Sequence, residues 1–488
     1  MVLVIILANI SYALSKVQGT EASGAIYIRA DGSIDPPTAP ISTADNGTYV
    51  FTADINNQSI SVERNNTTID GRGHVLQGSY LNFSYGINLS NVTNVTIENM
   101  RIDAFWYGIF LDSGSDHRIS GNNITNNVDA IFLQSTANDS ISENNITNNG
   151  GWGVVFFDAS NETLFRNNIT NNHDGVVLGP SSNNDISENN IANNIGDGIM
   201  LYGIFNHTTF KSSTTGNNIT NNNIKNNKAD GIKLISSTNN TISRNNVIEN
   251  QLAIEANYSS HNRIYNNNFV SNAQQVLCNS SWNTWDNGCP SGGNYWSDYD
   301  GTDSDQDGIG DTVHVIDANN TDNYPLMGMF SKFNVFLPYE KTENVTVISN
   351  STVSSLSLLI WLSSPYEGLQ PGQSFIQFSA TGENGSVGFC RLMIPRTVLN
   401  SSSYIVLVDS YPVNAIELPV SNSTHVYLYF TYAHSTHEVI VTIPEFASCL
   451  VLLLFMMATL LAVALYKRNK QLFKGQRLAK LQKEKKGT

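Results

Sequence analysis

Short apolar segments recur through the first half of the chain at a nearly fixed spacing. Each opens with Gly or Ala and continues with alternating apolar residues, as in residues 108–111, Gly-Ile-Phe-Leu. The second positions follow at steps of 22 or 23 residues with one step of 33: Ile87, Ile109, Ile131, Val154, Val176, Ile199, Ile232 and Ile254. A period of this length predicts one turn of a solenoid per repeat.

A second pattern, Asn-Asn-Ile with close variants, keeps the same register. Its apolar positions show the same steps and the same 33-residue exception: Ile124, Ile146, Ile169, Ile191, Ile224, Val247 and Phe269. Chance enrichment in Asn and Ile would not keep the two patterns synchronised. Alternation of apolar and polar residues between Asn, Gly and Ser turns indicates short strands. Stacked coils would pair equivalent strands and bury a column of Ile, Val and Leu.

The sequence therefore predicts an all-β fold: a right-handed parallel β-helix, a small antiparallel β-sandwich and one C-terminal transmembrane helix. Left-handed β-helices repeat in hexapeptides, and leucine-rich repeats need several Leu positions, so neither fits. Asn tolerates left-handed turn conformations, and its amide can bond to the same amide one coil away. We therefore expect a ladder of asparagines at Asn123, Asn145, Asn168, Asn190, Asn223, Asn246 and Asn268.

Changes in pattern divide the chain into successive segments. We expect an export signal segment at 1–24, an N-terminal cap at 25–80, β-helix repeats at 81–277, a C-terminal cap at 278–330, a β-sandwich stalk at 331–443, a transmembrane helix at 447–465 and a basic cytoplasmic tail at 466–488.

Charge and hydropathy indicate a setting at the cell surface. The formal net charge of −15 makes nucleic acid an improbable partner. Residues 447–465 carry no charge over 19 positions, which is long enough to span a bilayer. The following tail holds nine Lys or Arg and one acid, so the positive-inside rule places it in the cytoplasm. We expect a single-pass cell-membrane protein with an extracellular N-terminal ectodomain. Residues 443–446, Ile-Pro-Glu-Phe, resemble the C-termini of archaeal surface proteins.

A run of carboxylates after the repeats predicts a calcium loop. Asp303, Asp305, Asp307 and Asp311 occupy positions 1, 3, 5 and 9, with Gly at position 6. Oxygen ligands at alternate residues suit calcium. The twelfth position is His314 and not Glu, so a loop of the dockerin or thrombospondin-repeat kind fits better than a full EF-hand.

Cysteine spacing suggests a bridge at the end of the solenoid. Cys278 and Cys289 enclose ten residues just after the last repeat. A disulfide between them would pin the C-terminal end of the rod.

A family resemblance appears in the same region. Residues 293–299, Gly-Asn-Tyr-Trp-Ser-Asp-Tyr, with 305–311 and 324–326, resemble the C-terminal signature of NosD-like β-helix proteins, and the coils are similar. The resemblance covers about residues 45–330 and implies a surface or periplasmic β-helix. It also implies copper supply to nitrous-oxide reductase, or the carbohydrate binding and hydrolysis of related β-helices. The chain has no Met-rich tract and no consistently spaced histidine pair in the matched region, which disfavours copper.

Two sets of residues are candidates for ligand chemistry. Asp129, Asp174, Asp197 and Asp230 each precede the Gly or Ala that opens an apolar strand, so they should lie at one turn on four coils. Neighbouring carboxylates can act as general acid and base on a glycosidic bond, although Asp before Gly is also ordinary turn chemistry. We take Asp174, Asp197 and Asp230 as weak catalytic candidates.

The 33-residue coil holds an insertion of about ten residues, and long loops often carry binding. Its ligand-binding candidates are Tyr202, Phe205, His207, Phe210 and Lys211.

The sequence thus favours a membrane-anchored extracellular β-helix that binds glycan or another envelope component, in adhesion or envelope structure. A polysaccharide lyase, hydrolase or epimerase is the alternative, and a NosD-like copper accessory protein is a second one. A cluster of titratable groups would favour an enzyme, whereas aromatics and amides alone would favour binding. Whether the protein is an enzyme stays open.

Overall fold

The computed structural model describes residues 24–443 except 82, 207–208, 338–340 and 361–373, and it gives no side chains for 205, 206 and 209–212. The predicted export segment before Gly24, the transmembrane segment 447–465 and the tail 466–488 lie outside these residues. Within the part of the chain that is described, no helix is long and apolar enough to cross a membrane.

The chain divides into two compact units. One holds the residues up to Lys332 with Thr346–Thr352 and Gly388–Leu392; the other holds Phe333–Val345, Val353–Val387 and the residues from Met393 onward.

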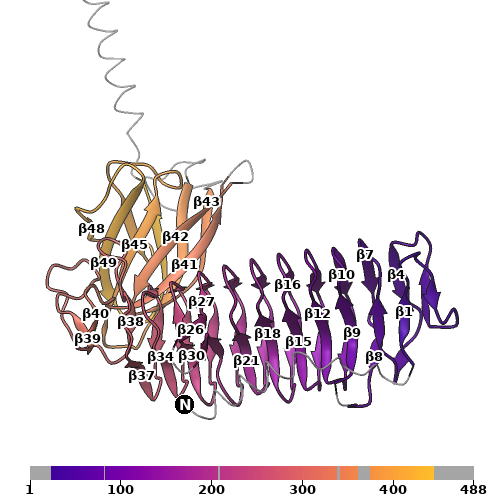
Figure 1. The fold of residues 1–488 in the computed structure, drawn as a ribbon. Helices are drawn as coiled ribbons and strands as arrows, with labels where there is room; N and C mark the ends of the chain where they lie inside the picture. Colours follow the sequence, from indigo (N-terminus) through magenta and orange to yellow (C-terminus); the bar gives the residue numbers. More distant parts are fainter. Residues whose placement is uncertain (1–23, 82, 207–208, 338–340, 361–373, 444–488) are drawn as a thin grey trace, which may run out of the picture. The chain divides into compact units, whose positions relative to one another are not determined.

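The first unit is a solenoid whose coils each contribute one strand to three long sheets (Figure 1). Sheet A has twelve strands in the order β2 (Ile34–Asp35), β1 (Ile26–Ile28), β6 (Ile60–Val62), β9 (Tyr85–Ser90), β12 (Tyr107–Asp112), β15 (Asp129–Gln134), β18 (Trp152–Phe157), β21 (Asp174–Leu178), β24 (Ile199–Tyr202), β30 (Asp230–Ile235), β34 (Leu252–Asn257) and β37 (Gln274–Asn279).

Sheet B follows sheet A in each coil. Its order is β3 (Ile41–Thr43), β4 (Thr48–Phe51), β7 (Thr67–Asp70), β10 (Val95–Glu98), β13 (Arg118–Ser120), β16 (Ser140–Ser142), β19 (Thr163–Phe165), β22 (Asp185–Ser187), β28 (Asn218–Thr220), β32 (Thr241–Ser243) and β35 (Arg263–Tyr265).

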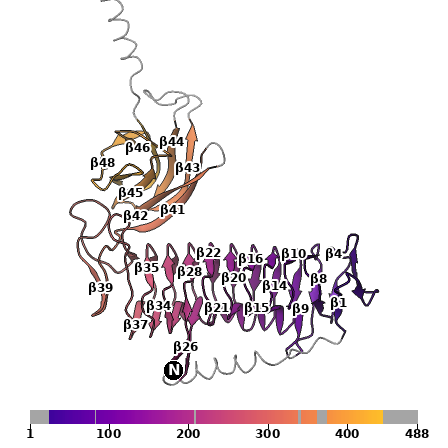
Figure 2. The same cartoon turned by 45° about the horizontal axis from the view of Figure 1, so that its top comes forward.

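Sheet C closes each coil, and the turned view shows the same stacking order (Figure 2). From the C-terminal end it runs β38 (Tyr295–Trp296), β36 (Asn268–Val270), β33 (Asn246–Ile248), β29 (Asn223–Lys225), β23 (Asn190–Ala192), β20 (Asn168–Thr170), β17 (Asn145–Thr147), β14 (Asn123–Thr125), β11 (Arg101–Asp103), β8 (Val75–Gln77) and β5 (Ile55–Asn56).

Equivalent strands of successive coils pair in parallel, and the residues that lie opposite each other are one repeat apart in the sequence. Ile109 lies opposite Ile131 in sheet A, and Ile124 lies opposite Ile146 in sheet C. The two apolar patterns of the sequence are therefore the sheet A and sheet C strands. At the N-terminal end, the pairs β1–β2 and β3–β4 are antiparallel, so the first coil departs from the repeat.

One interior column of apolar side chains runs through the solenoid. It begins at Ile26 and ends at Trp285 and Trp296, which are 0% and 1% exposed. Burying each such side chain contributes roughly 1.5–3 kcal/mol. The indole N–H groups bond to Asn320 and Asp322, so the end of the column is closed without unpaired donors.

Buried asparagines occupy the corners between sheets. One corner column, between sheets B and C, contains Asn122, Asn144, Asn167, Asn189, Asn222, Asn245, Asn267 and Asn294, and each amide nitrogen donates to the next side-chain oxygen at 2.9–3.1 Å. The predicted ladder also forms, in two parts along sheet C: from Asn123 to Asn223 and from Asn246 to Asn268. Asn168, for example, donates to Asn145 at 2.7 Å. Adjacent asparagines of the same motif thus have different environments.

The 33-residue coil keeps its place in all three sheets. The extra residues form an antiparallel hairpin, β25 (Ile204–Asn206) and β26 (Thr209–Ser212), next to the short parallel pair β27 (Thr214–Thr215) and β31 (Ser237–Thr238). The insertion therefore leaves the solenoid without breaking its register.

Cys278 and Cys289 are free, so the predicted disulfide is wrong in this structure. The register explains this result. Cys278 lies opposite Ala256 in sheet A and packs against the interior column, whereas Cys289 is exposed on the following loop.

Two five-stranded sheets follow the solenoid. One runs β41 (Met329–Phe336), β42 (Thr342–Ser349), β45 (Val387–Pro395), β49 (His425–Ala433) and β48 (Ala415–Glu417); the other runs β43 (Thr352–Ile360), β44 (Ser374–Thr381), β50 (Thr436–Thr442), β46 (Ile405–Val408) and β47 (Tyr411–Val413). The β44–β50, β46–β50 and β48–β49 pairs are antiparallel.

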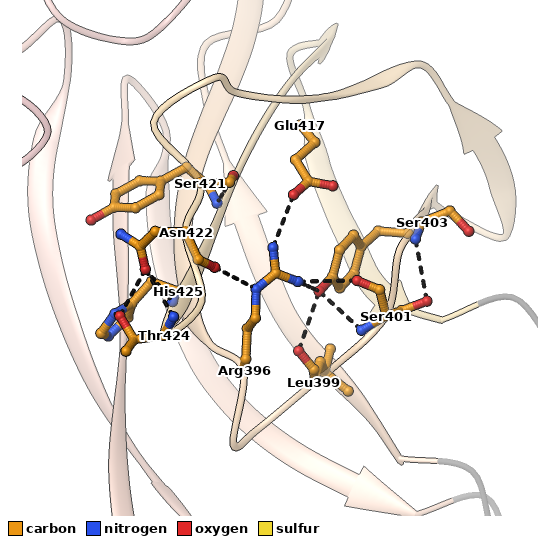
Figure 3. A network of polar contacts seen from close by, with 11 residues as sticks. Arg396, Leu399, Ser401, Ser403, Glu417, Ser421, Asn422, Thr424 and His425 are labelled. Carbon is orange, nitrogen blue, oxygen red and sulfur yellow. Dashed lines mark hydrogen bonds and ion pairs between the residues drawn. The ribbon is translucent and has the colours of Figure 1, made fainter.

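An arginine joins the connecting loops of this second unit (Figure 3). Arg396 donates to the carbonyl oxygens of Asn422 at 2.6 Å and Ser401 at 3.0 Å. It also donates to the Tyr404 hydroxyl and pairs with Glu417 at 3.1 Å. All of its partners are structural, and we assign this network no ligand.

Candidate functional site

The outer face of sheet A carries a second hydrophobic cluster. Phe132 alternates along β15 with Ile131 and Leu133, which lie in the interior column, so its ring points outward. The cluster contains Phe132, Val155, Phe157, Val177 and Tyr202, with Tyr107, Phe110, Trp152, Met200, Ile204 and Ile235 packed against it. An outward-facing position on a solenoid strand is normally polar, and here it is apolar on successive coils.

Aromatic rings form a continuous chain within and beside this cluster. Tyr85 stacks on Phe110 with ring centroids 4.7 Å apart, and Tyr107 lies 5.4 Å from Phe132. Tyr107, Phe110 and Trp152 are half-buried and keep part of their rings exposed. We call Tyr85, Tyr107, Phe110, Phe132 and Trp152 the outer aromatic strip.

The predicted carboxylates lie in one column beside this strip. Asp129 pairs in register with Tyr107, and Asp174 pairs with Trp152. A second set of contacts extends the column: the backbone N–H of Asp197 donates to Asp174 at 2.7 Å, and that of Asp230 donates to Asp197 at 3.0 Å. The structure thus brings the four residues together on one turn. One oxygen of Asp174 and one of Asp197 accept a backbone N–H, which is an ordinary structural role.

Lys233 gathers three of the carboxylates on this face. Its Nζ lies 2.8 Å from Asp230, 2.6 Å from Glu255 and 3.9 Å from Asp197. Lys233 and Glu255 are paired in register on β30 and β34, at the outward position that Met200 occupies one coil earlier. We call Asp197, Asp230, Lys233 and Glu255 the charged cluster.

Burial shifts the protonation of this column. It raises the pKa of Asp129 to about 7 and that of Asp197 to about 6, with Lys233 opposing the shift for Asp197. Burial and the bond to Glu255 raise the pKa of Asp230. Burial alone would raise the pKa of Glu255, but bonds from Asp230, Lys233 and Asn257 lower it overall. The cluster therefore contains carboxyl groups that exchange protons near neutral pH beside one that stays ionised.

Asp174 has different partners. Its Oδ2 accepts from the Trp152 indole at 3.2 Å and lies 3.1 Å from Nδ1 of His173. A carboxylate thus holds the Trp152 ring at the edge of the outer aromatic strip.

The insertion candidates lie next to the same face. Tyr202 and Ile204 belong to the outer hydrophobic cluster, and the β25–β26 hairpin follows them directly. The structure describes only the backbone of Phe205, Phe210 and Lys211, and His207 lies outside the described residues. These four therefore stay predictions, whereas Tyr202 is placed at the cluster.

Three of the four predicted calcium ligands converge. Asp303, Asp305 and Asp307 each present an oxygen within 4.8 Å of the others, the one group of this kind among the described residues. Asp311 instead accepts the Ser304 N–H at 2.6 Å, and that bond lowers its pKa. Burial raises the pKa of Asp303 and of Asp307. A divalent cation stabilises ionised carboxylates and would offset these raised pKa values. Asp303, Asp305 and Asp307 are therefore the residues that would hold calcium.

The ring contacts of His314 are with aromatic residues of the C-terminal cap. Its ring stacks on Trp296 with centroids 4.5 Å apart, on β39 (His314–Asp317), which pairs with β40 (Asn320–Asp322). The twelfth position of the loop therefore belongs to the cap of the solenoid.

Comparison with known families agrees with the strand order. The profile of the family described as periplasmic copper-binding protein (NosD) matches residues 166–301, and that of the right handed beta helix region matches residues 85–218. Both matches lie within the solenoid and agree with its fold, a right-handed parallel β-helix. Its NosD-like character, expected from residues 293–299, is shown by the first match. No curated protein matches the chain.

Solved structures similar to this β-helix include three with related folds. A mutant of the periplasmic alginate epimerase AlgG has 17% identity and a TM-score of 0.38, covering 54% of this chain and 82% of its own. The Dettilon tailspike protein has 14% identity and a TM-score of 0.39, and the match covers 86% of this chain and 93% of that protein. An exopolygalacturonase from Thermotoga maritima has 13% identity and a TM-score of 0.39, and the match covers 54% of this chain and 79% of that enzyme. TM-scores this low support no conclusion about the function of this β-helix.

Sequence reasoning missed the outer aromatic strip and Glu255. The signal was present in the middle position of the Ile-x-Leu strands, which reads Asn88, Phe110, Phe132, Val155, Val177, Met200, Lys233 and Glu255 along the coils. Polar residues are expected at an outward position, so this run of apolar ones was the signal for the outer hydrophobic cluster.

Proposed function

We propose that this β-helix protein binds glycan on the outer face of sheet A. The observation that supports this most is the outer aromatic strip beside a column of carboxylates. Aromatic rings pack on the apolar faces of sugar rings, and carboxylates accept hydrogen bonds from sugar hydroxyls. One face carries both kinds of side chain over several coils, which suits an extended polymer. Tyr107, Phe110 and Trp152 are half-buried, whereas the four aspartates are 4–8% exposed, so the aromatic residues offer most of the contact.

The setting of this function rests on the sequence. The uncharged segment 447–465 and its basic flank predict anchoring in the cell membrane with the solenoid outside. In that position, glycan binding would serve adhesion or envelope structure. Calcium in the Asp303–Asp307 loop would stabilise the cap next to the last coil.

A polysaccharide-active enzyme is a second candidate, and the charged cluster favours it. Asp230 has a raised pKa and Glu255 a lowered one, and both lie within 2.8 Å of the same Lys233 nitrogen. Glycoside hydrolases also use a neutral acid and an ionised carboxylate, with the two carboxyl groups about 5 Å or more apart. Asp230 and Glu255 are bonded to each other, so they share the protonation states of such a pair and not its spacing.

One experiment separates these functions. The purified full-length protein is tested on a glycan panel at millimolar calcium, and both binding and the release of new reducing or unsaturated ends are measured. Binding without new ends supports the binding function. New ends that disappear in Asp230→Asn or Glu255→Gln would establish the enzyme. Neither signal would contradict both.

Copper binding, which the name of the matched family carries, is tested in the same preparation. A titration with Cu²⁺ at neutral pH that shows tight stoichiometric binding would favour the accessory-protein alternative.

A further inference from the structure

The outer face of sheet A has a strong imbalance of charge. The nine strands from β9 to β37 contain five acids, Asp112, Asp129, Asp174, Asp230 and Glu255, and one base, Lys233. Asp197 lies two residues before the start of β24 and extends the acidic column. Bases are found instead in strands of the other two sheets: Arg118 and Arg263 in sheet B, and Arg101 and Lys225 in sheet C.

The single base on this face is not free for a ligand. Lys233 contacts Asp197, Asp230 and Glu255, and its side chain is only 22% exposed. Its role is to hold mutually repelling carboxylates together in one cluster. Among the side chains that the structure describes on this face, a glycan carboxylate would therefore meet three acids and no unpaired ammonium.

The charged cluster adjoins the apolar part of the face. Lys233 follows Met200 in the outward column, and Ile235 on the same strand packs against the outer hydrophobic cluster with Tyr202. A polymer lying along the aromatic rings would therefore pass over these carboxylates. Charges about 4 Å apart interact by about 1 kcal/mol even in water, and more beside an apolar surface.

Building on the proposed glycan binding, we infer that the ligand is a neutral or amine-bearing glycan and that this face rejects polyuronates. The negative charge of these carboxylates attracts protonated amines and does not oppose neutral hydroxyl groups, whereas it repels uronate carboxylates. The class of polymer is thereby set by the acids of four successive coils.

The test compares three oligosaccharides of matched length: a neutral β-linked glucan, a chitosan oligomer and an oligouronate. Their affinities for the full-length protein are measured by calorimetry at pH 7.5. We expect the oligouronate to bind at least tenfold more weakly than the other two. Equal or tighter binding of the oligouronate overturns the inference and leaves the proposed glycan binding intact.

Charge variants identify the cause. The triple variant Asp197→Asn, Asp230→Asn, Glu255→Gln leaves Lys233 unopposed and should improve oligouronate binding at least tenfold, while the neutral glucan changes little. Asp185→Asn, which removes an acid from sheet B, is the matched control and should change neither. Glu255→Gln alone gives the same direction should the triple variant fail to fold. Unchanged oligouronate binding in folded variants overturns the inference, and binding of none of the three oligomers overturns the proposed function with it.

Discussion

At the scale of single residues, environment separates side chains that look alike in the sequence. Asn189 and Asn190 are neighbours in one Asn-Asn-Ile motif. Asn189 is 1% exposed and its amide donates to Leu164, Ser187 and Asn222, whereas Asn190 lies on the outer face of sheet C. The first satisfies buried backbone groups, and the second makes side-chain bonds to Asn168 and Asn223.

Asn189→Ala should therefore destabilise the solenoid by about 2 kcal/mol or more, because it leaves buried carbonyl oxygens and the Asn167 N–H without partners. Asn190→Ala should cost less than about 1 kcal/mol. Thermal melting of both variants measures the difference. Equal shifts in the two variants would contradict the assigned roles.

A second residue-scale feature is a buried acidic pair in another corner column. Asp139 and Glu162 are 2% and 1% exposed, at the position that Asn184 and Asn217 fill in later coils. The Asp139 N–H donates to Glu162, and Thr136 donates to its other oxygen. Burial raises the pKa of Asp139 and of Glu162, so protonated forms mimic the asparagines of the other coils.

The sign of the pH dependence follows from these raised values. Below about pH 4 the acids are protonated in both folded and unfolded states, and their burial carries no ionisation cost. As the pH rises toward the folded pKa values, only the unfolded state ionises freely, and stability falls. Asp139→Asn with Glu162→Gln should raise the melting temperature at pH 8 by several degrees and leave it nearly unchanged at pH 4. Equal shifts at both pH values would contradict this account.

At the scale of elements, much of the solenoid could be predicted from the sequence. The 22- or 23-residue step fixed the coils because each strand pairs with its own equivalent, and the 33-residue step reappears as the β25–β26 hairpin. Which side chains point into the solenoid and which point outward could not be predicted from the sequence with the same accuracy. Cys278 continues the Ala256 column inward, and the outward run from Phe110 to Met200 contradicts ordinary polar alternation.

The calcium loop is an element whose function has a direct test. Millimolar calcium should raise the melting temperature of the full-length protein, and Asp305→Ala should abolish the shift. Asp305 is exposed, whereas Asp303 and Asp307 also accept backbone N–H groups, so their substitution would disturb the loop without any metal. Asp300→Ala, an exposed acid just before the loop, is the control. A calcium response that persists in Asp305→Ala would contradict this assignment.

At the scale of the whole molecule, the sequence predicts a membrane attachment. A chain that ends at residue 446 should appear in the medium of the producing cells, whereas the full chain should stay with the membrane fraction, because residues 447–465 are long and apolar enough to span a bilayer. Fractionation followed by immunoblotting measures this. Retention of the shortened chain in the membrane would contradict the anchor.

The solenoid as a whole presents one face that differs from the others in both apolarity and charge. Sheet A carries the outer aromatic strip and an acidic column, while sheet C shows a regular row of asparagine amides. We therefore expect glycan to bind on the face of sheet A.

The most direct test is the affinity of a panel-identified glycan for three variants, measured by calorimetry. Tyr107→Ala and Trp152→Ala remove half-buried rings of the outer aromatic strip, and each should weaken binding at least tenfold, about 1.4 kcal/mol. Trp282→Ala removes a ring that is 56% exposed elsewhere on the solenoid and should leave the affinity unchanged. Unchanged affinity in Tyr107→Ala and Trp152→Ala, or a loss confined to Trp282→Ala, would contradict the claim.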